Sequence, residues 1–134
     1  MTHWAVDIRG LCRGFDQADG RRLAVLRGLN LEMPVGELLT ITGASGCGKS
    51  TLLHIIACLD VPEGGVIRVM GQDLGSLGRR DKRVYRNRTV GMVYQFHHLL
   101  PELTVLENVL FPALIHRFDV ASILPRARRL LDRV

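Results

Sequence analysis

Short apolar runs alternate with glycine-rich turns through much of the chain. Residues 3–11 and 23–33 alternate apolar and polar side chains, which predicts two half-buried strands joined by a turn-rich segment at residues 13–22. The run Leu38 to Thr42 is apolar and predicts a strand that leads directly into a glycine-rich stretch. Residues 66–74 predict a further strand with a Gly-Gln turn, and a short apolar strand is predicted from Val90 to Tyr94.

Three segments carry helical patterns from that glycine-rich stretch onward. A helix is predicted from Lys49 to Leu59, because the following DVPEGG contains a proline and two glycines that prevent its continuation. Thr104 with Glu107 three residues later forms a capping-box pattern, which predicts a helix start. Residues 119–134 are also helical in pattern, and Pro125 either kinks that helix or marks its start. Four arginines are expected on its outer face: Arg126, Arg128, Arg129 and Arg133.

The stretch GASGCGKST, residues 43–51, satisfies the spacing G-x-x-x-x-G-K-[ST] between the predicted strand and helix. Glycines let the backbone curl so that successive N–H groups converge on phosphate oxygens, and the start of the helix adds its positive end. A chance glycine-rich turn ahead of a core helix is the alternative. The sequence therefore predicts a nucleotide site formed by Gly43, Ala44, Ser45, Gly46, Cys47, Gly48, Lys49, Ser50 and Thr51.

Individual residue types in this stretch indicate separate roles. We expect Lys49 to contact the β- and γ-phosphates, Ser50 to bind magnesium and Thr51 to donate to the α-phosphate. Cys47 lies where the field that attracts phosphate would also favour a thiolate, so redox sensing is one interpretation. We favour the other, a small side chain tolerated where only the backbone matters.

The composition agrees with one compact domain. The chain has 134 residues, of which 47% are hydrophobic and 23% charged. Its apolar runs are shorter than the roughly 18 residues of a membrane span, and its start lacks the apolar stretch of a signal peptide. Its three cysteines show no Cys-x-x-Cys spacing, which argues against a disulfide framework or a zinc site. We therefore expect a cytosolic chain with free thiols.

The net charge of +5 is concentrated in the segment Arg79 to Arg88. A nucleic-acid interface is one interpretation, but Tyr85 is the one aromatic residue in that run and belongs to no interleaved stacking set. We favour a solvated helical face near an anionic membrane surface, and we expect no nucleic-acid partner. His97 and His98 are neighbours whose side chains point apart on an extended segment, so loop packing is favoured over a shared metal.

Three long stretches resemble the ATP-binding subunit of ABC transporters. They are LAVLRGLNLEMPVGE (23–37), GASGCGKSTLLHIIACLDVPEGG (43–65) and VGMVYQFHHLLPELTVLENV (90–109), in the family's order. The resemblance implies an α/β fold, a P-loop NTPase of ABC type that is incomplete here. It comprises an amino-terminal antiparallel β region, the phosphate-loop strand and helix, and the start of the helical subdomain. Within the family, the sequence of these stretches is most similar to that of the lipoprotein-releasing LolD subfamily, and next to that of the macrolide-export type.

The resemblance also implies ATP and magnesium as cofactors and adds further site residues. Gln95 is similar to the family's Q-loop glutamine, which touches magnesium, with a surface amide as the alternative. Phe15 is similar to the aromatic residue that stacks on adenine, with turn packing as the alternative. The loop from Phe96 to Leu103 resembles the surface that receives the membrane-spanning subunits, and packing within the domain is its rival. The family further implies a second ATP-binding subunit and a cytoplasmic location, peripheral on the inner face of the plasma membrane.

Several parts of the family's hydrolytic site are not found in the sequence. LGSLG, residues 74–78, lacks the signature Ser-Gly-Gly, and Asp60 belongs to the helix after the phosphate loop rather than to an Asp-Glu strand. We therefore expect residues 1–134 to be the amino-terminal portion of one ABC ATP-binding domain with no catalytic residue of its own, and to be marginally stable and aggregation-prone. The alternative is a shortened protein that still binds nucleotide. We favour a truncated portion of a longer ATPase, because the strands that would flank Leu38 to Thr42 in a doubly wound sheet would come from the missing half.

The sequence leaves three candidate functions. The first is an ATPase subunit that couples hydrolysis to export or extraction at the inner membrane, with lipoprotein release as its expected role. The second is a nucleotide-binding module that does not hydrolyse ATP. The third is a nucleic-acid-binding protein, driven by the basic segment.

Overall fold

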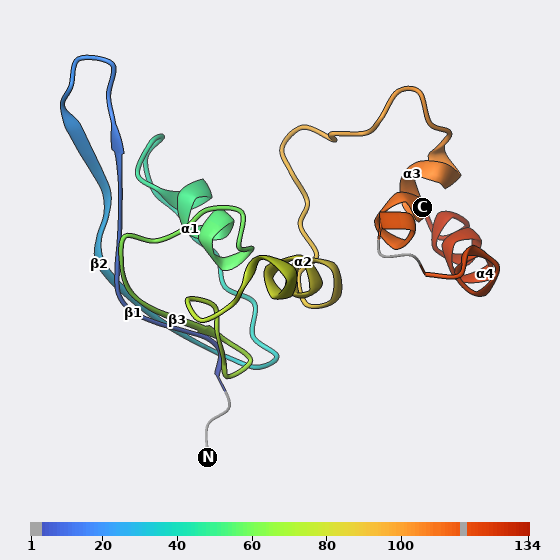
Figure 1. Cartoon of the computed structure of the whole chain (residues 1–134), viewed down its shortest axis with the longest axis horizontal. Helices are drawn as coiled ribbons and strands as arrows, with labels where there is room; N and C mark the ends of the chain where they lie inside the picture. The colour runs from blue at the N-terminus through green and yellow to red at the C-terminus, as the bar shows by residue number, and fades with distance from the viewer. Residues whose placement is uncertain (1–3, 116–117) are drawn as a thin grey trace. The chain divides into compact units, whose positions relative to one another are not determined.

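The computed structural model describes residues 4–115 and 118–134. The chain divides into two compact units, residues 1–86 and residues 87–134. The first unit contains an antiparallel sheet and the helix that follows the glycine-rich stretch, and the second contains a pair of helices (Figure 1). The candidate phosphate loop lies in the first unit.

The sheet is built around a long hairpin of β1 (Trp4–Asp16) and β2 (Arg22–Pro34), drawn in blue in Figure 1. The other side of β1 pairs with β3 (Gly64–Val69), which continues through a turn to β4 (Gln72–Asp73). The strand order is β2-β1-β3-β4, and all three pairings are antiparallel. The predicted antiparallel β region is therefore confirmed, with residue 3 of its first strand outside the described residues.

The hairpin is longer than its sequence pattern predicts. β1 continues to Asp16 and β2 begins at Arg22, so much of the segment assigned to a turn at residues 13–22 is strand. The turn itself closes with a hydrogen bond of 2.7 Å from the Gln17 N–H to the Arg21 carbonyl. Cross-strand pairing thus overrides the glycine and aspartate content that indicated a long turn.

The helix after the glycine-rich stretch, α1 (Lys49–Ile56), ends three residues earlier than the predicted Leu59. Cys58 adopts a left-handed backbone with φ of 54°, a conformation that ends a helix. The Arg86 Nη1 atom donates a 2.9 Å hydrogen bond to the Cys58 carbonyl, which follows the helix. A carbonyl just beyond the end of α1 is thus satisfied by a side chain from α2 (Arg79–Arg88), a contact that no local pattern reveals.

The core of the first unit combines one face of the sheet with the inner face of α1. Ile8, Leu11, Ile55 and Ile67 are the large side chains most completely removed from solvent. Around them lie Val6, Leu26, Leu52, Val69, Leu74 and Tyr85. Burial of this apolar set supplies the main force that holds α1 on the sheet.

Two predicted strands are not formed. The runs Leu38 to Thr42 and Val90 to Tyr94 have no strand partner among the described residues, and Figure 1 draws them as coil. Leu38 is 96% exposed and Val93 is 99% exposed. Both runs have strand-like composition, but a strand needs a neighbouring backbone to satisfy its N–H and C=O groups. Their prediction as strands was wrong for the described residues for that reason.

The basic segment forms α2, as its helical interpretation predicts. Four of its arginines are exposed, namely Arg79, Arg80, Arg83 and Arg88, which fits a solvated face. Tyr85 is buried on the opposite side, where its hydroxyl donates a 2.7 Å hydrogen bond to the Ile56 carbonyl at the end of α1. Within the first unit, α2 is therefore joined to the end of α1 by the neutral Tyr85 side chain, and by Arg86 to the Cys58 carbonyl just beyond it.

The second unit contains α3 (Val105–Ile115) and α4 (Val120–Leu131). The capping box at the start of α3 is confirmed: the Glu107 Oε2 atom accepts from the Thr104 N–H and hydroxyl at 2.7 Å each, and the Glu107 N–H donates to the Thr104 Oγ1 atom. These hydrogen bonds hold the pKa of Glu107 below its ordinary value. The helix start is therefore stabilised by a charged cap.

The hydrogen bond at the start of α4 shows where Pro125 lies in the helix. The Asp119 carboxylate accepts a 3.1 Å hydrogen bond from the Ala121 N–H, so the helix begins at Val120 and Pro125 lies inside it. The four arginines predicted on its outer face are exposed. In the described stretches 4–115 and 118–134, we find no helix with the length and apolar character needed to cross a bilayer.

We expect the exposed run Leu38 to Thr42 to promote aggregation of the chain. An unpaired apolar β-prone segment offers free backbone groups to other chains, and a lysine within it opposes that pairing. We expect Leu38→Lys to raise the soluble fraction on refolding, measured by light scattering, and to change the free energy of unfolding by less than about 0.5 kcal/mol. Leu53→Lys is the control, because Leu53 is exposed on α1 where the backbone is already paired. An equal gain from both variants would contradict the role of the unpaired segment.

We expect the stability of the chain to depend on pH because Tyr85 is buried. Burial, with a smaller contribution from Cys58, raises the pKa of Tyr85 from 10.0 to about 12. Because the folded chain favours the neutral phenol, its contribution to the free energy of unfolding is complete below pH 10 and is lost as the pH rises toward 12.

We expect Tyr85→Phe to destabilise the chain by about 1–3 kcal/mol at neutral pH, because the Ile56 carbonyl loses its donor. The difference between the two chains should shrink as the pH is raised. Urea unfolding at a series of pH values measures it, and a difference that stays constant up to pH 12 would contradict the raised pKa.

Candidate functional site

The turn that enters α1 is shaped by three glycines with left-handed or related backbone conformations. Gly43, Gly46 and Gly48 have φ angles of 153°, 78° and 101°. A Cβ atom on Gly48 would lie 2.7 Å from the Val25 Cγ1 atom and 3.0 Å from the Leu26 Cδ2 atom, both on β2. Glycine at this position is therefore required by conformation and by space, and it brings the start of α1 directly against the hairpin.

Lys49 turns its side chain back into the loop that precedes it. Its ammonium donates to the Gly43 carbonyl at 2.8 Å and to the Ala44 carbonyl at 2.7 Å. These two contacts place a positive charge inside the curve of the loop, at the point where the sequence predicts phosphate binding. The carbonyl acceptors are weaker partners for an ammonium than phosphate oxygens are. The arrangement therefore fits an anion that would take the lysine from them.

The amino-terminal end of α1 adds to the same positive field. Its first turn contains no acidic residue, so nothing in that turn offsets the helix dipole. Ser50 is exposed and Thr51 half-buried in this turn, and the Gly48 carbonyl accepts the first helical hydrogen bond from the Leu52 N–H at 2.9 Å. Free N–H groups, a lysine and two hydroxyls are the donor set that suits a polyphosphate with a divalent cation.

The remaining loop residues are open to solvent. Ala44, Ser45, Gly46 and Cys47 are all exposed, and the Cys47 N–H donates to the Ala44 carbonyl at 3.4 Å to close the turn. The Cys47 Sγ atom lies 3.7 Å from the Lys49 ammonium. It also occupies the space beside Gly43, where an added Cβ would lie only 2.8 Å from it. Cys47 thus packs within the loop, and its redox role stays a hypothesis.

Phe15 lies on β1, near the tip of the hairpin, and is 40% exposed. It pairs across the hairpin with Leu23, two residues from the Val25 side chain that contacts Gly48. At about 3.3 Å per residue, this spacing is about 7 Å along the strand. The predicted aromatic residue and the predicted phosphate loop are therefore neighbours in the first unit. The Arg13 guanidinium carbon lies 4.6 Å from the centre of the Phe15 ring.

Gln95 and the loop from Phe96 to Leu103 belong to the second unit. Gln95 is exposed, and its approach to the phosphate loop stays a prediction. Within the loop, Phe96, Leu99 and Leu100 are exposed, as the expectation of a docking surface requires. His98 contacts Tyr94 edge to face at 5.0 Å, and no set of metal-ligating side chains occurs among the residues that the structure describes.

Asn108 on α3 fixes the shape of this loop, a role that the sequence analysis missed. Its Nδ2 atom donates to the carbonyls of Leu100, Leu103 and Thr104 at 3.0, 3.1 and 3.0 Å, and its Oδ1 atom accepts from the Leu100 N–H at 2.9 Å. Because an amide NH₂ has two hydrogens, one of them is shared between carbonyls, and the side chain contacts four backbone groups in all. An asparagine directly after a capping box was the available signal, but its partners could not be read from spacing alone.

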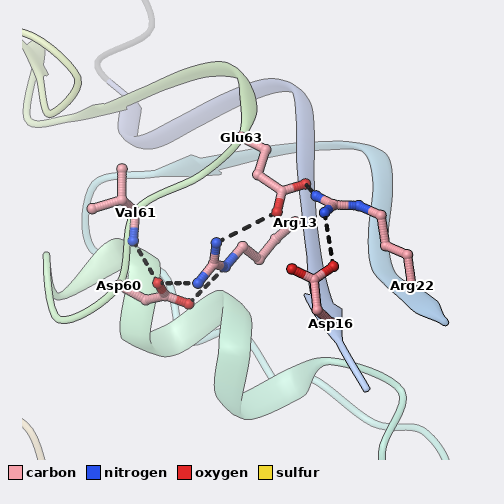
Figure 2. A network of polar contacts seen from close by, with 6 residues as sticks. All are labelled: Arg13, Asp16, Arg22, Asp60, Val61 and Glu63. Atoms are coloured by element: carbon pink, nitrogen blue, oxygen red, sulfur yellow. Dashed lines mark hydrogen bonds and ion pairs between the residues drawn. The ribbon is translucent and has the colours of Figure 1, made fainter. Parts of the chain in front are cut away.

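A network of ion pairs around Arg13 was also missed (Figure 2). Arg13 donates to both oxygens of Asp60, at 3.0 and 2.8 Å, and contacts Glu63 at 3.5 Å. Arg22 in turn contacts Glu63 at 2.6 Å and Asp16 at 3.1 Å. The hydrogen bond from Arg22 holds the pKa of Glu63 below its ordinary value. Since Asp60 is 47 residues from Arg13 in the sequence, no local pattern indicates this pair.

The chain is similar to a known protein family and to curated proteins. The sequence pattern described as ABC transporter matches residues 26–134. LolD 1 of Rhodopirellula baltica, a lipoprotein-releasing system ATP-binding protein, is 47% identical over 86% of this chain and 50% of its own length. The LolD protein of Pseudomonas fluorescens is 49% identical over 96% of this chain and 56% of its own length. The chain thus spans about half the length of these curated relatives.

Solved structures agree with the sequence relatives. The dimeric structure of MJ0796, a bacterial ABC transporter cassette, is 31% identical, with a TM-score of 0.83 over 95% of this chain and 54% of that chain. A post-hydrolysis state of MJ0796 bound to ADP and Pi is 30% identical, with a TM-score of 0.84 and similar coverage. The predicted fold class, an incomplete α/β cassette with an antiparallel sheet, is therefore confirmed.

The close packing of Gly48 against β2 leads to a prediction for the free energy of unfolding. We expect Gly48→Ala to lower the free energy of unfolding by about 2 kcal/mol or more, because the new Cβ overlaps Val25 and the left-handed backbone is strained. Gly64→Ala is the control in the same unit, since its Cβ would meet its nearest neighbour at an ordinary 3.8 Å. Urea unfolding measures both variants. Equal stability of the two would show that the close packing of the loop against β2 is not rigid.

Proposed function

The chain belongs to the ABC transporter family, and from this premise we propose that it binds ATP with magnesium at residues 43–51. The observation that carries the proposal is the Lys49 ammonium held inside a glycine-hinged loop at the start of α1. That arrangement combines an ammonium, backbone N–H groups and an unopposed helix dipole at one point. The ADP and Pi bound by the structurally similar cassette support the same class of ligand.

Each residue of the loop has a proposed role in holding the nucleotide. Lys49 exchanges its two carbonyl acceptors for oxygens of the β- and γ-phosphates. The hydroxyl of Ser50 is a magnesium ligand, Thr51 donates to the α-phosphate, and the backbone of residues 43–48 supplies the remaining donors. Phe15 stacks on the base, and a magnesium role for Gln95 rests on its resemblance to the family's Q-loop glutamine alone. Magnesium would neutralise charge on the phosphates when it is bound.

We further propose that this chain alone does not hydrolyse ATP. Of the acidic residues in the first unit, Asp60 follows α1 most closely, but both its oxygens accept hydrogen bonds from Arg13 and one also accepts from the Val61 N–H at 2.7 Å. A carboxylate occupied in this way is a poor general base. Hydrolysis would then belong to a complete ATP-binding domain, and the chain as it stands is a nucleotide-binding module.

The names of the relatives support a transport role. Proteins named as lipoprotein-releasing system ATP-binding proteins are 42–49% identical to this chain. We propose that the complete polypeptide couples ATP hydrolysis to lipoprotein release at the inner membrane. Its proposed partners are membrane-spanning subunits, which dock at Phe96 to Leu103, and a second ATP-binding subunit. The exposed apolar side chains of that loop, held in shape by Asn108, support the docking role.

Binding and turnover can be separated with one lysine variant. We expect the purified chain to bind MgATP, and Lys49→Ala to weaken that binding by about 10- to 100-fold, the effect of one charge-assisted contact. Lys82→Ala is the matched control, because it removes the chain's other lysine, on α2, and so changes the net charge equally. Titration calorimetry measures the affinity, and phosphate release measures turnover.

Two outcomes would contradict the proposal. Equal affinities for the Lys49→Ala and Lys82→Ala chains would remove the phosphate loop as the nucleotide site. Phosphate release above that of Lys49→Ala would mean that the chain contains a general base other than Asp60, and the non-hydrolysing role would be wrong.

A further inference from the structure

Arg13 is held more firmly than an arginine on a surface strand usually is. Its guanidinium makes a two-bond fork with the Asp60 carboxylate, at 3.0 and 2.8 Å, and a longer contact with Glu63 (Figure 2). Both side chains of the Arg13–Asp60 pair are only 23% exposed. The planar fork fixes the orientation of the guanidinium as well as its position.

The same guanidinium contacts the Phe15 ring. Its central carbon lies 4.6 Å from the ring centre, within the roughly 6 Å over which a cation and an aromatic face attract each other. Arg13 therefore joins the ring to Asp60, and Asp60 follows the carboxy-terminal end of the helix that begins at the phosphate loop. Phe15 keeps 40% of its surface exposed despite this contact, which leaves ring surface available to a ligand.

We propose that Arg13 is a positioning residue for the nucleotide base: it holds the Phe15 ring in the orientation that stacks on the base, and Asp60 holds Arg13. The inference rests on the proposed nucleotide site. An aromatic side chain that is already immobilised loses less conformational freedom when a base stacks on it, so the affinity for the base rises. Arg13 touches the ring and not the phosphates, so its effect is confined to ligands that carry a base.

The test compares a ligand with a base and a ligand without one. MgATP and magnesium tripolyphosphate are titrated calorimetrically into the unchanged chain and into Arg13→Gln. We expect Arg13→Gln to bind MgATP about three- to tenfold more weakly, the effect of ordering one side chain, and to bind tripolyphosphate as the unchanged chain does. Asp60→Asn should weaken MgATP binding in the same direction. Unchanged tripolyphosphate binding also reports that the variant is folded.

Two controls isolate the route through Phe15. Arg22→Gln breaks the ion pairs with Glu63 and Asp16 in the same network but leaves the ring contact, so it should change neither affinity. In a Phe15→Ala background, Arg13→Gln should have no further effect on MgATP, because a residue that acts through the ring has nothing left to position.

The inference is overturned if Arg13→Gln weakens both ligands equally, weakens neither, or still weakens MgATP in the Phe15→Ala background. Failure of the proposed function has a different signature. In that case Lys49→Ala would leave tripolyphosphate binding unchanged, or the unchanged chain would bind neither ligand, and the inference would fall with the site on which it rests.

Discussion

The approach of Gly48 to Val25 and Leu26 is the contact on which the candidate site depends. Those side chains lie where a Cβ atom on residue 48 would have to be, so the backbone at the start of α1 rests directly on β2. The direction of the helix, and with it the field at its amino-terminal end, is thereby set by the hairpin. Lys49 follows immediately, and its short distance to the Gly43 and Ala44 carbonyls shows how tightly the loop curls at that point.

Those features of the chain that depend on near neighbours were predicted from the sequence. The glycine spacing before Lys49, the capping box at Thr104 and the hairpin strands each involve residues that are close in sequence or that alternate with a clear period. Such patterns carry their own physical cause, because the backbone conformation or hydrogen bond they imply is made within the pattern. The glycine turns that lead into α1 were predictable for this reason, and phosphate binding by residues 43–51 stays a proposal.

Contacts between distant segments were not predictable in this way. The pairs Arg13–Asp60, Tyr85–Ile56 and Arg86–Cys58 join residues 28 to 47 positions apart, and a single sequence contains no signal for them. The same limitation explains the two strands that were wrongly predicted. Leu38 to Thr42 has the composition of a strand, but strand formation is decided by a partner that composition does not specify.

The ends of α1 explain how the loop keeps its form although the segment before it is unpaired. At the amino-terminal end, Gly48 packs on β2, and beyond the carboxy-terminal end, Asp60 is held by Arg13 of β1 while the Cys58 carbonyl is held by Arg86. Contacts at both ends and the burial of Leu52 and Ile55 therefore hold this short helix on the sheet. The position of the phosphate loop therefore follows from the hairpin and α1, and the run Leu38 to Thr42 is not needed to set it.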